Sequence, residues 1–361
     1  MSKMMDTYAR QPVTFEKGEG VWLWAKDGKK YLDALSGVAV NGLGHTHPKL
    51  IKAINEQISR LIHVSNVYHI AEQEKLAEKL TSIAHMDNVF FCNSGCEANE
   101  AAIKLARLYG HQNGIDTPEI IVMEKAFHGR TMATLSATGN RKTQAGFEPL
   151  VGGFIRVAFD DLEAIQQIAS RKNNVVAILV EPIQGEGGIN IPSNIQNYLK
   201  GLRALCDEHD WLLMLDEVQS GIGRTGKWFA HQHTAIQPDV MTLAKGLGSG
   251  VPIGACLARG KASQVFTPGK HGSTFGGNPL ATAAGYATLN IIEEDKLCNH
   301  ASKMGALINE EFTKHLKDCP QVKVIRNLGL MIGIELDQPC GDLTKLALDA
   351  GLLINVTADK V

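Results

Sequence analysis

Short apolar runs alternate with amphipathic stretches through the middle of the chain. The runs predict six strands, at Val89–Cys92, Ile120–Met123, Val175–Val180, Leu212–Leu215, Val240–Leu243 and Gly254–Ala258. The amphipathic stretches predict helices that include Glu97–Tyr109, Asp161–Ser170 and Ile195–His209. Because strands that are apolar on both faces need cover on both sides, this alternation predicts an α/β fold with a mainly parallel sheet between two layers of helices.

The two ends of the chain show different patterns. Turn-rich segments flank Val21–Trp24 and predict a hairpin, and residues 47–85 have helical spacing. After Asn278 the spacing is helical to about Leu316, and further apolar runs predict a second, smaller sheet, at Val322–Ile325, Met331–Leu336 and Leu352–Asn355. Since 361 residues exceed the size of a single core, we expect a large domain at 46–284 and a smaller α+β domain from both ends, 1–45 and 285–361.

Composition narrows the class of ligand. Lysine and arginine number 36, aspartate and glutamate 38, and no basic stripe is present, so we expect a small polar metabolite and no nucleic-acid partner. The seven cysteines lack the spacing of a disulfide framework or a zinc site, which indicates reduced thiols, a cytoplasmic protein and no metal. Neither a signal peptide nor a membrane span is predicted, because no apolar stretch has the required length.

Two apolar runs end in residues that could do chemistry together. Asp216 ends the run from Leu212, and Lys245 follows the run from Val240, so both are predicted at the carboxyl edge of the sheet, where open α/β sheets bind ligands. Partial burial would lower the pKa of the lysine and free its amine for covalent chemistry, while Asp216 needs a cationic partner. A pyridine ring between them satisfies both, which is what pyridoxal 5′-phosphate (PLP) requires. Taken alone, an aspartate at the end of a strand is more often a helix cap or a surface salt-bridge partner, so neither residue by itself indicates this site.

Two further polar segments follow predicted strands. Asn93–Glu100 begins a helix, where free backbone N–H groups could hold a phosphate, or where Ser94 and Glu97 could form an ordinary capping box. After the next strand, Phe127 could stack on a planar ring and Arg130 could bind a carboxylate through two hydrogen bonds. Both segments therefore add candidate ligand contacts at the same edge of the sheet.

Six motifs occur along the chain in a recognisable order. They are NSGCEANE from Asn93, FHGRT from Phe127, EPIQGEGG from Glu181, LDEVQSGIGRTG from Leu215, TLAKGLGSGVPIGA from Thr242 and HGSTFGGNPL from His271. Together they closely resemble the class III, fold type I PLP-dependent aminotransferases, and within them the acetylornithine aminotransferase group. The similarity runs from about Tyr8 to the end of the chain, and it implies a PLP-binding large domain and a homodimer with shared active sites.

The resemblance implies a role for particular residues. Lys245 would be the catalytic residue, bound covalently to PLP and then acting as general base and acid. The other cofactor contacts that it implies within the same subunit are Gly95, Cys96, Phe127, Asp216 and Gln219. Thr274 would contact the cofactor from the partner subunit. The substrate contacts that it implies within the same subunit are Tyr8, Arg130 and Glu186. Ser273 would contact the substrate from the partner subunit. In the family position 96 is commonly threonine, so at Cys96 only the backbone contact carries over.

Glu186 resembles a switch glutamate, which pairs with an arginine until the second carboxylate of a substrate displaces it. The resemblance places that arginine in a segment of the form R-x-x-P-P, expected just beyond Val361, where the sequence stops. It therefore leaves two possibilities, a shortened sequence or a protein without the partner of the switch.

The implied reaction is ping-pong transfer of the terminal amino group of N2-acetylornithine to 2-oxoglutarate, giving N-acetylglutamate 5-semialdehyde and glutamate in arginine biosynthesis. Succinyldiaminopimelate, succinylornithine, ornithine and 4-aminobutyrate stay open as donors, as does a shortened, non-catalytic PLP-binding protein. Residues 37–41 read Gly-Val-Ala-Val-Asn near a point where ornithine δ-aminotransferases usually carry tyrosine. A small aliphatic residue there leaves room for an acyl group.

Overall fold

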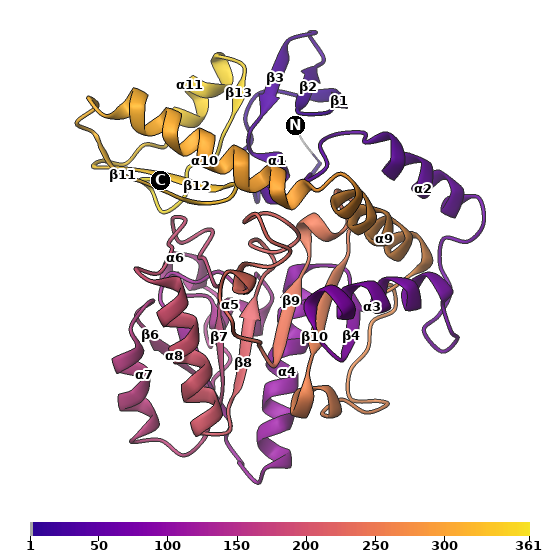
Figure 1. Ribbon diagram of the computed structural model, residues 1–361, viewed down its shortest axis with the longest axis vertical. Coiled ribbons are helices and arrows are strands. Elements are labelled where there is room, and N and C mark those ends of the chain that lie inside the picture. The colour runs from indigo at the N-terminus through magenta and orange to yellow at the C-terminus, as the bar shows by residue number, and fades with distance from the viewer. Residues whose placement is uncertain (1–2) are drawn as a thin grey trace.

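A seven-stranded sheet forms the centre of the molecule in a computed structural model that describes residues 3–361 (Figure 1). Residues 1–2, which belong to the predicted small domain, lie outside the described residues. The strand order is β4 (Asn88–Cys92), β10 (Gly254–Ala258), β9 (Val240–Leu243), β8 (Leu212–Asp216), β7 (Val175–Val180), β5 (Glu119–Met123) and β6 (Phe154–Val157). Neighbouring strands are parallel except for β10, which runs antiparallel to both of its neighbours. The predicted mainly parallel sheet is confirmed, with β6 as an additional edge strand.

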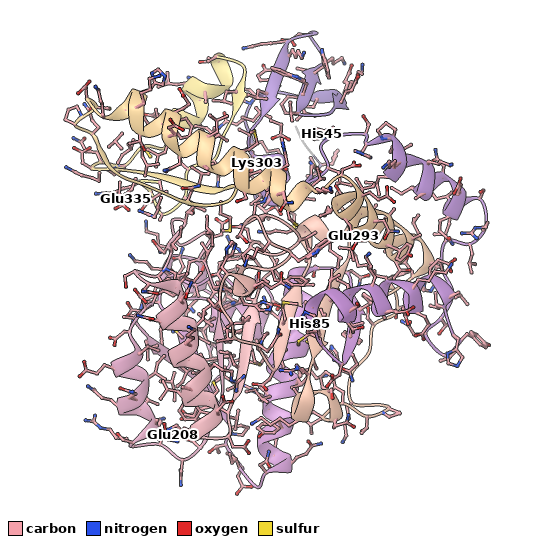
Figure 2. All side chains as sticks on the ribbon, in the orientation of Figure 1. His45, His85, Glu208, Glu293, Lys303 and Glu335 are labelled. Atoms are coloured by element: carbon pink, nitrogen blue, oxygen red, sulfur yellow. The ribbon has the colours of Figure 1, made fainter. Side chains whose placement is uncertain are left out.

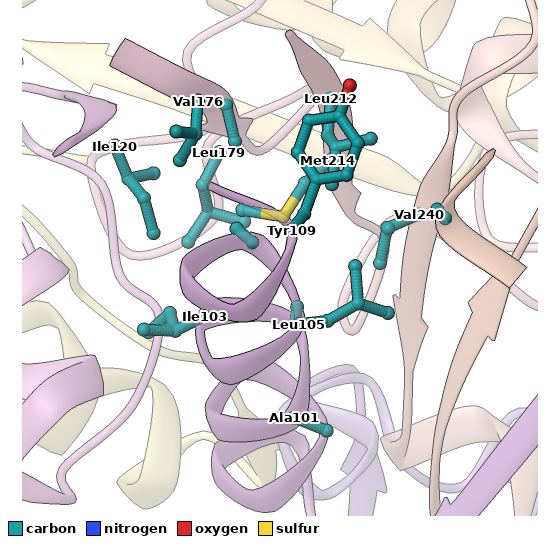
Figure 3. Packing of buried hydrophobic residues seen from close by; sticks show 14 of the residues in the cluster. Ala101, Ile103, Leu105, Tyr109, Ile120, Val176, Leu179, Leu212, Met214 and Val240 are labelled. Carbon is teal, nitrogen blue, oxygen red and sulfur yellow. The ribbon is translucent and has the colours of Figure 1, made fainter. Parts of the chain in front are cut away.

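Successive residues of the central strands pack against helices on opposite faces of the sheet. Ile120 and Val122 of β5 contact the cluster around α4 (Gly95–Gln112), as Figure 3 shows for Ile120. Ile121 and Met123 contact the other face, which is covered by α7 (Leu162–Ala169) and α8 (Ile195–Glu208). This is the two-residue period of a strand with both faces covered. Each large side chain buried in this way contributes about 1.5–3 kcal/mol.

A second group of helices covers the β4–β10 end of the sheet. Leu76 and Leu80 of α3 (Ala71–Ala84) pack with Leu289 of α9 (Pro279–Glu294) against β9 and β10. The remaining helices are α1 (Ser36–Ala39), α2 (Pro48–Ile58), α5 (Met132–Ala137), α6 (Arg141–Gln144), α10 (Leu297–Leu316), α11 (Leu343–Asp349) and the short 3-10 helices Ala230–His233, Lys245–Leu247 and Gly260–Gln264. The predicted helical stretch after Asn278 is two helices, because Lys296 between them has left-handed backbone.

The three apolar runs near the end of the chain belong to two sheets, so the prediction of one smaller sheet was wrong. β11 (Val322–Leu328) and β12 (Met331–Leu336) form an antiparallel pair. β13 (Leu352–Leu353) instead lies parallel to β3 (Lys30–Asp33), next to β2 (Trp22–Ala25) and β1 (Phe15–Glu19). A short strand carries no signal of its partner, and this one pairs with the beginning of the chain.

The carboxyl edge of the central sheet faces the layer that contains α10, β11 and β12 (Figure 1). Arg326 of β11 donates a hydrogen bond of 2.7 Å to the backbone oxygen of Ile189, in the loop after β7. The backbone N–H of Leu330 donates to the oxygen of Arg224, in the loop after β8. In Figure 2, Glu335 lies in this layer, whereas Glu208 lies at the opposite, amino edge of the sheet. Loops from both parts therefore meet at the edge where the predicted chemistry lies.

Candidate active site

A cavity of about 350 Å³ opens at the carboxyl edge of the central sheet. Its wall includes seven of the residues predicted to contact cofactor or substrate, which are Gly95, Cys96, Phe127, Glu186, Asp216, Gln219 and Lys245. They come from four different loops that follow β4, β5, β7 and β8, and from the turn after β9. The parallel strands thus bring together side chains that lie 150 positions apart in the sequence.

Asp216, the last residue of β8, is 4% exposed and held by several hydrogen bonds. Its Oδ2 accepts one bond of 2.8 Å from Nδ2 of Asn99 and another of 2.8 Å from Nδ1 of His128. Its Oδ1 accepts from the backbone N–H of Val218 at 3.1 Å. Donors of this kind stabilise the negative charge and fix the orientation of the carboxylate.

Lys245 emerges from the end of β9 in a left-handed backbone conformation, with φ of 45°. Such a conformation costs of order 1–3 kcal/mol in a residue other than glycine and is concentrated at functional sites. Burial lowers the pKa of the Lys245 amine, although Glu186 and Asp216 act in the opposite direction. Within residues 3–361 the amine forms no hydrogen bond or ion pair, so it is available as a nucleophile.

Helix α4 begins at the cavity wall. Ser94 is its N-cap and accepts a hydrogen bond of 3.2 Å from the N–H of Glu97, so the capping interaction is present. The preceding N–H groups, those of Gly95 and Cys96, have no acceptor within the helix, and they remain for an anion at the positive end of the helix dipole. A Cβ on Gly95 would lie 2.7 Å from Cγ1 of Val218, so this close approach requires glycine.

Gln219 and Glu186 are fixed by neighbouring loops. Gly185 packs against the Gln219 side chain so closely that a Cβ there would lie 1.7 Å from Oε1 of Gln219. Thr357, near the end of the chain, donates to the backbone oxygen of Glu186 and lies 3.4 Å from its Oε2. The loop after β7 is therefore held on one side by the loop after β8 and on the other by the C-terminal segment.

The other four predicted contacts lie outside this cavity. Tyr8 is 72% exposed, and Arg130 is exposed with its guanidinium 5.7 Å from the ring of Phe127. Ser273 accepts from the N–H of Gly276 at 2.9 Å and from Asn93, while Thr274 is exposed beside it. The roles assigned to these residues remain predictions, which for Ser273 and Thr274 depend on a second subunit.

Several buried polar residues around Asp216 were not predicted from the sequence. Asn99 of α4 donates to Asp216 and to the backbone oxygen of His128, and it accepts from Oγ1 of Thr242 at 2.7 Å. Glu181, directly after β7, lines the same cavity and is 6% exposed. An asparagine within a helix and a threonine within an apolar run are the signals that could have pointed to this network.

A second buried carboxylate stands next to Asp216. Oε1 of Glu217 accepts from both the N–H and Nδ1 of His231 at 2.9 Å, and Oε2 accepts from Ala230 at 2.6 Å and Ser220 at 2.9 Å. These bonds fix the loop that follows β8, which carries Gln219. Neither Glu217 nor His231 was predicted to matter.

The residues that line the cavity match the chemical groups of PLP. An unpaired buried amine and a buried carboxylate share its wall with an aromatic ring and a helix N-terminus, which match the aldehyde, ring nitrogen, ring face and phosphate of the cofactor. Among residues 3–361 no cluster of three or more metal-binding side chains is found, and no helix there has the length and apolar character to cross a membrane.

Comparison with known proteins agrees with this arrangement. Residues 4–361 match the family model described as aminotransferase class-III. Over its full length the chain is 63% identical to an acetylornithine aminotransferase of Nitrosomonas europaea and 49% identical to that of Aquifex aeolicus, of which it covers 91% and 93%.

Solved structures show the same fold. The acetylornithine aminotransferase of Elizabethkingia anophelis is 38% identical with a TM-score of 0.88, over 99% of this chain and 89% of that one. The ornithine aminotransferase of Toxoplasma gondii is 34% identical with a TM-score of 0.95, over 99% and 86%. A further structure of the Toxoplasma enzyme is described with partial occupancy of PLP at its active site. This chain belongs to the class-III aminotransferases, a family of PLP-dependent transaminases with fold type I.

Proposed function

We propose that this chain transfers the terminal amino group of N2-acetylornithine to 2-oxoglutarate, giving N-acetylglutamate 5-semialdehyde and glutamate in arginine biosynthesis. The observation that carries the choice of donor is the position of Val40 in the wall of the cavity that holds Lys245 and Asp216. A small aliphatic side chain there leaves room for the acetyl group of the donor. The curated relatives named acetylornithine aminotransferase, at 47–63% identity, support the same choice.

The residues of this chain divide the chemistry between them. When bound, PLP supplies an electron-accepting ring that stabilises negative charge on the substrate carbon. Lys245 would hold the cofactor through Nζ, and once displaced by the amine of the donor it would take a proton from the terminal carbon and return it. Asp216 would keep the ring nitrogen protonated, with Phe127 on the ring face, Gln219 beside the phenolic oxygen and the N–H groups of Gly95 and Cys96 on the phosphate.

Substrate contacts complete the proposal. Arg130 and Tyr8 would bind the α-carboxylate end, and Glu186 would respond to the second carboxylate of 2-oxoglutarate. Glu186 lies close enough to Lys245 to influence its charge, which supports a place beside the reacting atoms. With two unlike substrates using one cavity in turn, a ping-pong sequence follows.

A cytoplasmic homodimer with shared sites is part of this proposal. The segment with Val67, which is 80% exposed, lies beside Phe275, which is 60% exposed, and Asn66 joins the two through a hydrogen bond to the oxygen of Ser273. Apolar side chains grouped on a surface in this way favour contact with another protein surface. A second copy seated there would cover them and receive Ser273 and Thr274. We also propose the division into a large domain, 46–284, and a small domain from both ends.

Ornithine is the second candidate donor, because the Toxoplasma gondii enzyme with the same fold is an ornithine aminotransferase. The free α-amino group of ornithine needs a polar partner that acetylornithine does not need. Val40 offers none, so the acylated donor is the better fit.

The test is a half-reaction. The purified chain with PLP is mixed with N-acetylornithine, without any oxo acid, and the absorbance of the cofactor is followed; ornithine, 4-aminobutyrate and the succinylated donors are compared in parallel. Conversion of the cofactor to its aminated form by N-acetylornithine at the lowest concentration supports the proposal. If another donor converts the cofactor at a lower concentration, that compound is the preferred amino donor. If no donor converts it, the chain is a PLP-binding protein without transaminase activity.

A further inference from the structure

Two carboxyl groups lie side by side at the carboxyl edge of the sheet, and only one of them has a part in the proposed chemistry. In the ladder between β7 and β8, Val180 pairs with Leu215, so the residues that follow, Glu181 and Asp216, occupy neighbouring positions. Val180 and Leu215 pack on the α7–α8 face, so the next residues point to the opposite face. Both carboxyl groups line the cavity and both are buried.

The hydrogen bonds around the two carboxyl groups are unequal. Asp216 accepts three bonds of 2.8–3.1 Å, two of them from the side chains of Asn99 and His128. Among residues 3–361, Glu181 accepts two backbone N–H groups, from Phe127 at 3.1 Å and from Gly185 at 3.5 Å. When two neighbouring acids differ in this way, the better-supplied one keeps the charge and the other is neutral.

The charged groups around Glu181 favour the same assignment. Burial raises the pKa of Glu181 well above its usual range, and the adjacent charge of Asp216 raises it further. Lys245, after β9, acts in the opposite direction, but its own amine is buried and faces Glu186 and Asp216 as well. His128 also lies at this point, and its Nδ1 is bonded to Asp216.

The two partners of Glu181 connect it to the residues proposed to surround the cofactor ring. Its Oε2 fixes the backbone of Phe127, and its Oε1 fixes Gly185, which packs on the side chain of Gln219. Glu181 thus links the loops after β5 and β7 without itself being needed as an acid or a base.

We propose that Glu181 is a positioning residue, a neutral carboxyl group that holds the Phe127 and Gly185–Gln219 walls around the cofactor ring while it leaves the negative charge on Asp216. The proposal rests on the proposed function only in that PLP occupies this cavity. It goes beyond that function by separating the roles of two adjacent acids.

The decisive comparison is Glu181→Gln in the full chain, loaded with PLP, with the exposed Glu163→Gln as matched control and Asp216→Asn as the variant that removes a charge. The pH midpoint of the spectral transition of the bound cofactor is measured. Because glutamine is also neutral, the midpoint of Glu181→Gln should equal that of the unaltered chain, whereas Asp216→Asn should shift it by about 1–3 pH units. A shift of a unit or more in Glu181→Gln overturns the neutral assignment.

The positioning role is tested by Glu181→Ala, which leaves the N–H of Phe127 without an acceptor. Its dissociation constant for PLP should rise about tenfold, and Glu181→Gln should restore most of the affinity. Equal affinity in Glu181→Ala and the unaltered chain would remove the positioning role.

A third measurement needs neither cofactor nor turnover. Infrared spectra of the protein without PLP at neutral pH should contain a protonated-carboxyl band that is absent from Glu181→Gln and present in Glu163→Gln. If Glu181→Gln does not fold, titration of that band in the unaltered chain decides the matter, because an ionised Glu181 gives no such band at neutral pH. If N-acetylornithine is not the donor, the pH midpoint, the PLP affinity and the infrared band stay as expected. The proposed donor and the proposed role of Glu181 are therefore tested separately.

Discussion

Nδ1 of His128 lies 2.8 Å from Oδ2 of Asp216, and both side chains are buried. The histidine comes from the loop after β5 and the aspartate is the last residue of β8, so one hydrogen bond joins that loop to the end of the strand. Among residues 3–361 the other ring nitrogen of His128 has no hydrogen-bond partner and is buried, so no second bond of this side chain could replace the one to Asp216.

Replacing His128 with phenylalanine should weaken cofactor binding. The variant keeps the volume of the ring but removes a hydrogen bond to a charged group, worth about 1.5–3 kcal/mol. The dissociation constant for PLP, measured by equilibrium dialysis, should therefore rise about 10- to 100-fold. His209→Phe, an exposed histidine at the amino edge of the sheet, is the control. Unaltered affinity in His128→Phe would mean that Asn99 and Val218 hold Asp216 without it.

Threonine at position 96 should strengthen the phosphate contact. Sγ of Cys96 accepts the N–H of Arg130 at 3.3 Å, and a thiol is a weak donor toward a phosphate. A hydroxyl group in its place adds a hydrogen bond of about 0.5–1.5 kcal/mol. The affinity for PLP should then increase about 3- to 10-fold in Cys96→Thr and not in Cys96→Ala. Weaker binding by Cys96→Thr would show that the bond to Arg130 matters more than the phosphate contact.

Glu217→Gln should destabilise the whole domain rather than the site alone. The carboxylate satisfies four donors in a fully buried place, and an amide leaves some of them opposite an NH₂ group. Each buried donor left without an acceptor costs about 1–3 kcal/mol. Urea unfolding should show this decrease, whereas Glu208→Gln at the exposed end of α8 should change little. A decrease below about 1 kcal/mol would contradict the importance of these bonds.

A methyl group at position 185 should disturb the site through Gln219. The Cβ of Gly185→Ala would lie 1.7 Å from Oε1 of Gln219, so that side chain or the loop must move. Overpacking of this kind costs about 1–3 kcal/mol, and the affinity for PLP should fall with it. Gly152→Ala is a matched control, since no atom lies within 4 Å of its Cβ. If both variants bind PLP equally well, Gln219 does not contribute to binding.

In the protein without cofactor, the positive charge of Lys245 should lower the free energy of unfolding. Burial lowers the pKa of its amine, so the unfolded chain binds the proton more tightly than the folded one. Below the folded pKa this cost is fully present, and it disappears as the pH rises toward the unfolded value of about 10.4. Lys245→Met should therefore be more stable than the unaltered chain at neutral pH, with a gap that closes toward pH 10. Denaturant unfolding at several pH values measures this difference in the free energy of unfolding. A difference that grows as the pH rises would contradict a lowered pKa for Lys245. The same variant should show no turnover and no lysine-bound cofactor absorbance.

The sequence predicted the central strands well because their apolar runs are continuous. Val175–Val180 and Val240–Leu243 have the predicted bounds. Every residue of these strands is buried, so the apolar run begins and ends with the strand. β6 was missed because Phe154–Val157 is a short edge strand that contains Arg156. The partner of β13 was assigned wrongly because a two-residue strand gives no information about register.

The site was predictable where a polar residue ends an apolar run. Asp216 and Lys245 were identified as candidates for that reason, and both line the same cavity. Asn99, by contrast, looks like an ordinary helix residue, and only the packing of α4 on β8 and β9 brings its amide to Asp216. Residues predicted to act from a second subunit, such as Thr274, have no partner that a single chain could indicate.

The pairing of β13 with β3 has a consequence for how the protein is made. Lys29, next to β3, donates a hydrogen bond to the backbone oxygen of Asp349, 320 residues later. At about 5–20 residues per second, a ribosome needs some tens of seconds to supply that partner. Until then β3 exposes an unpaired edge, and such edges recruit strands from other nascent chains. Synthesis speed and chaperone capture during this interval should thus affect the yield of the protein, although the cavity at the carboxyl edge is built from strands completed earlier.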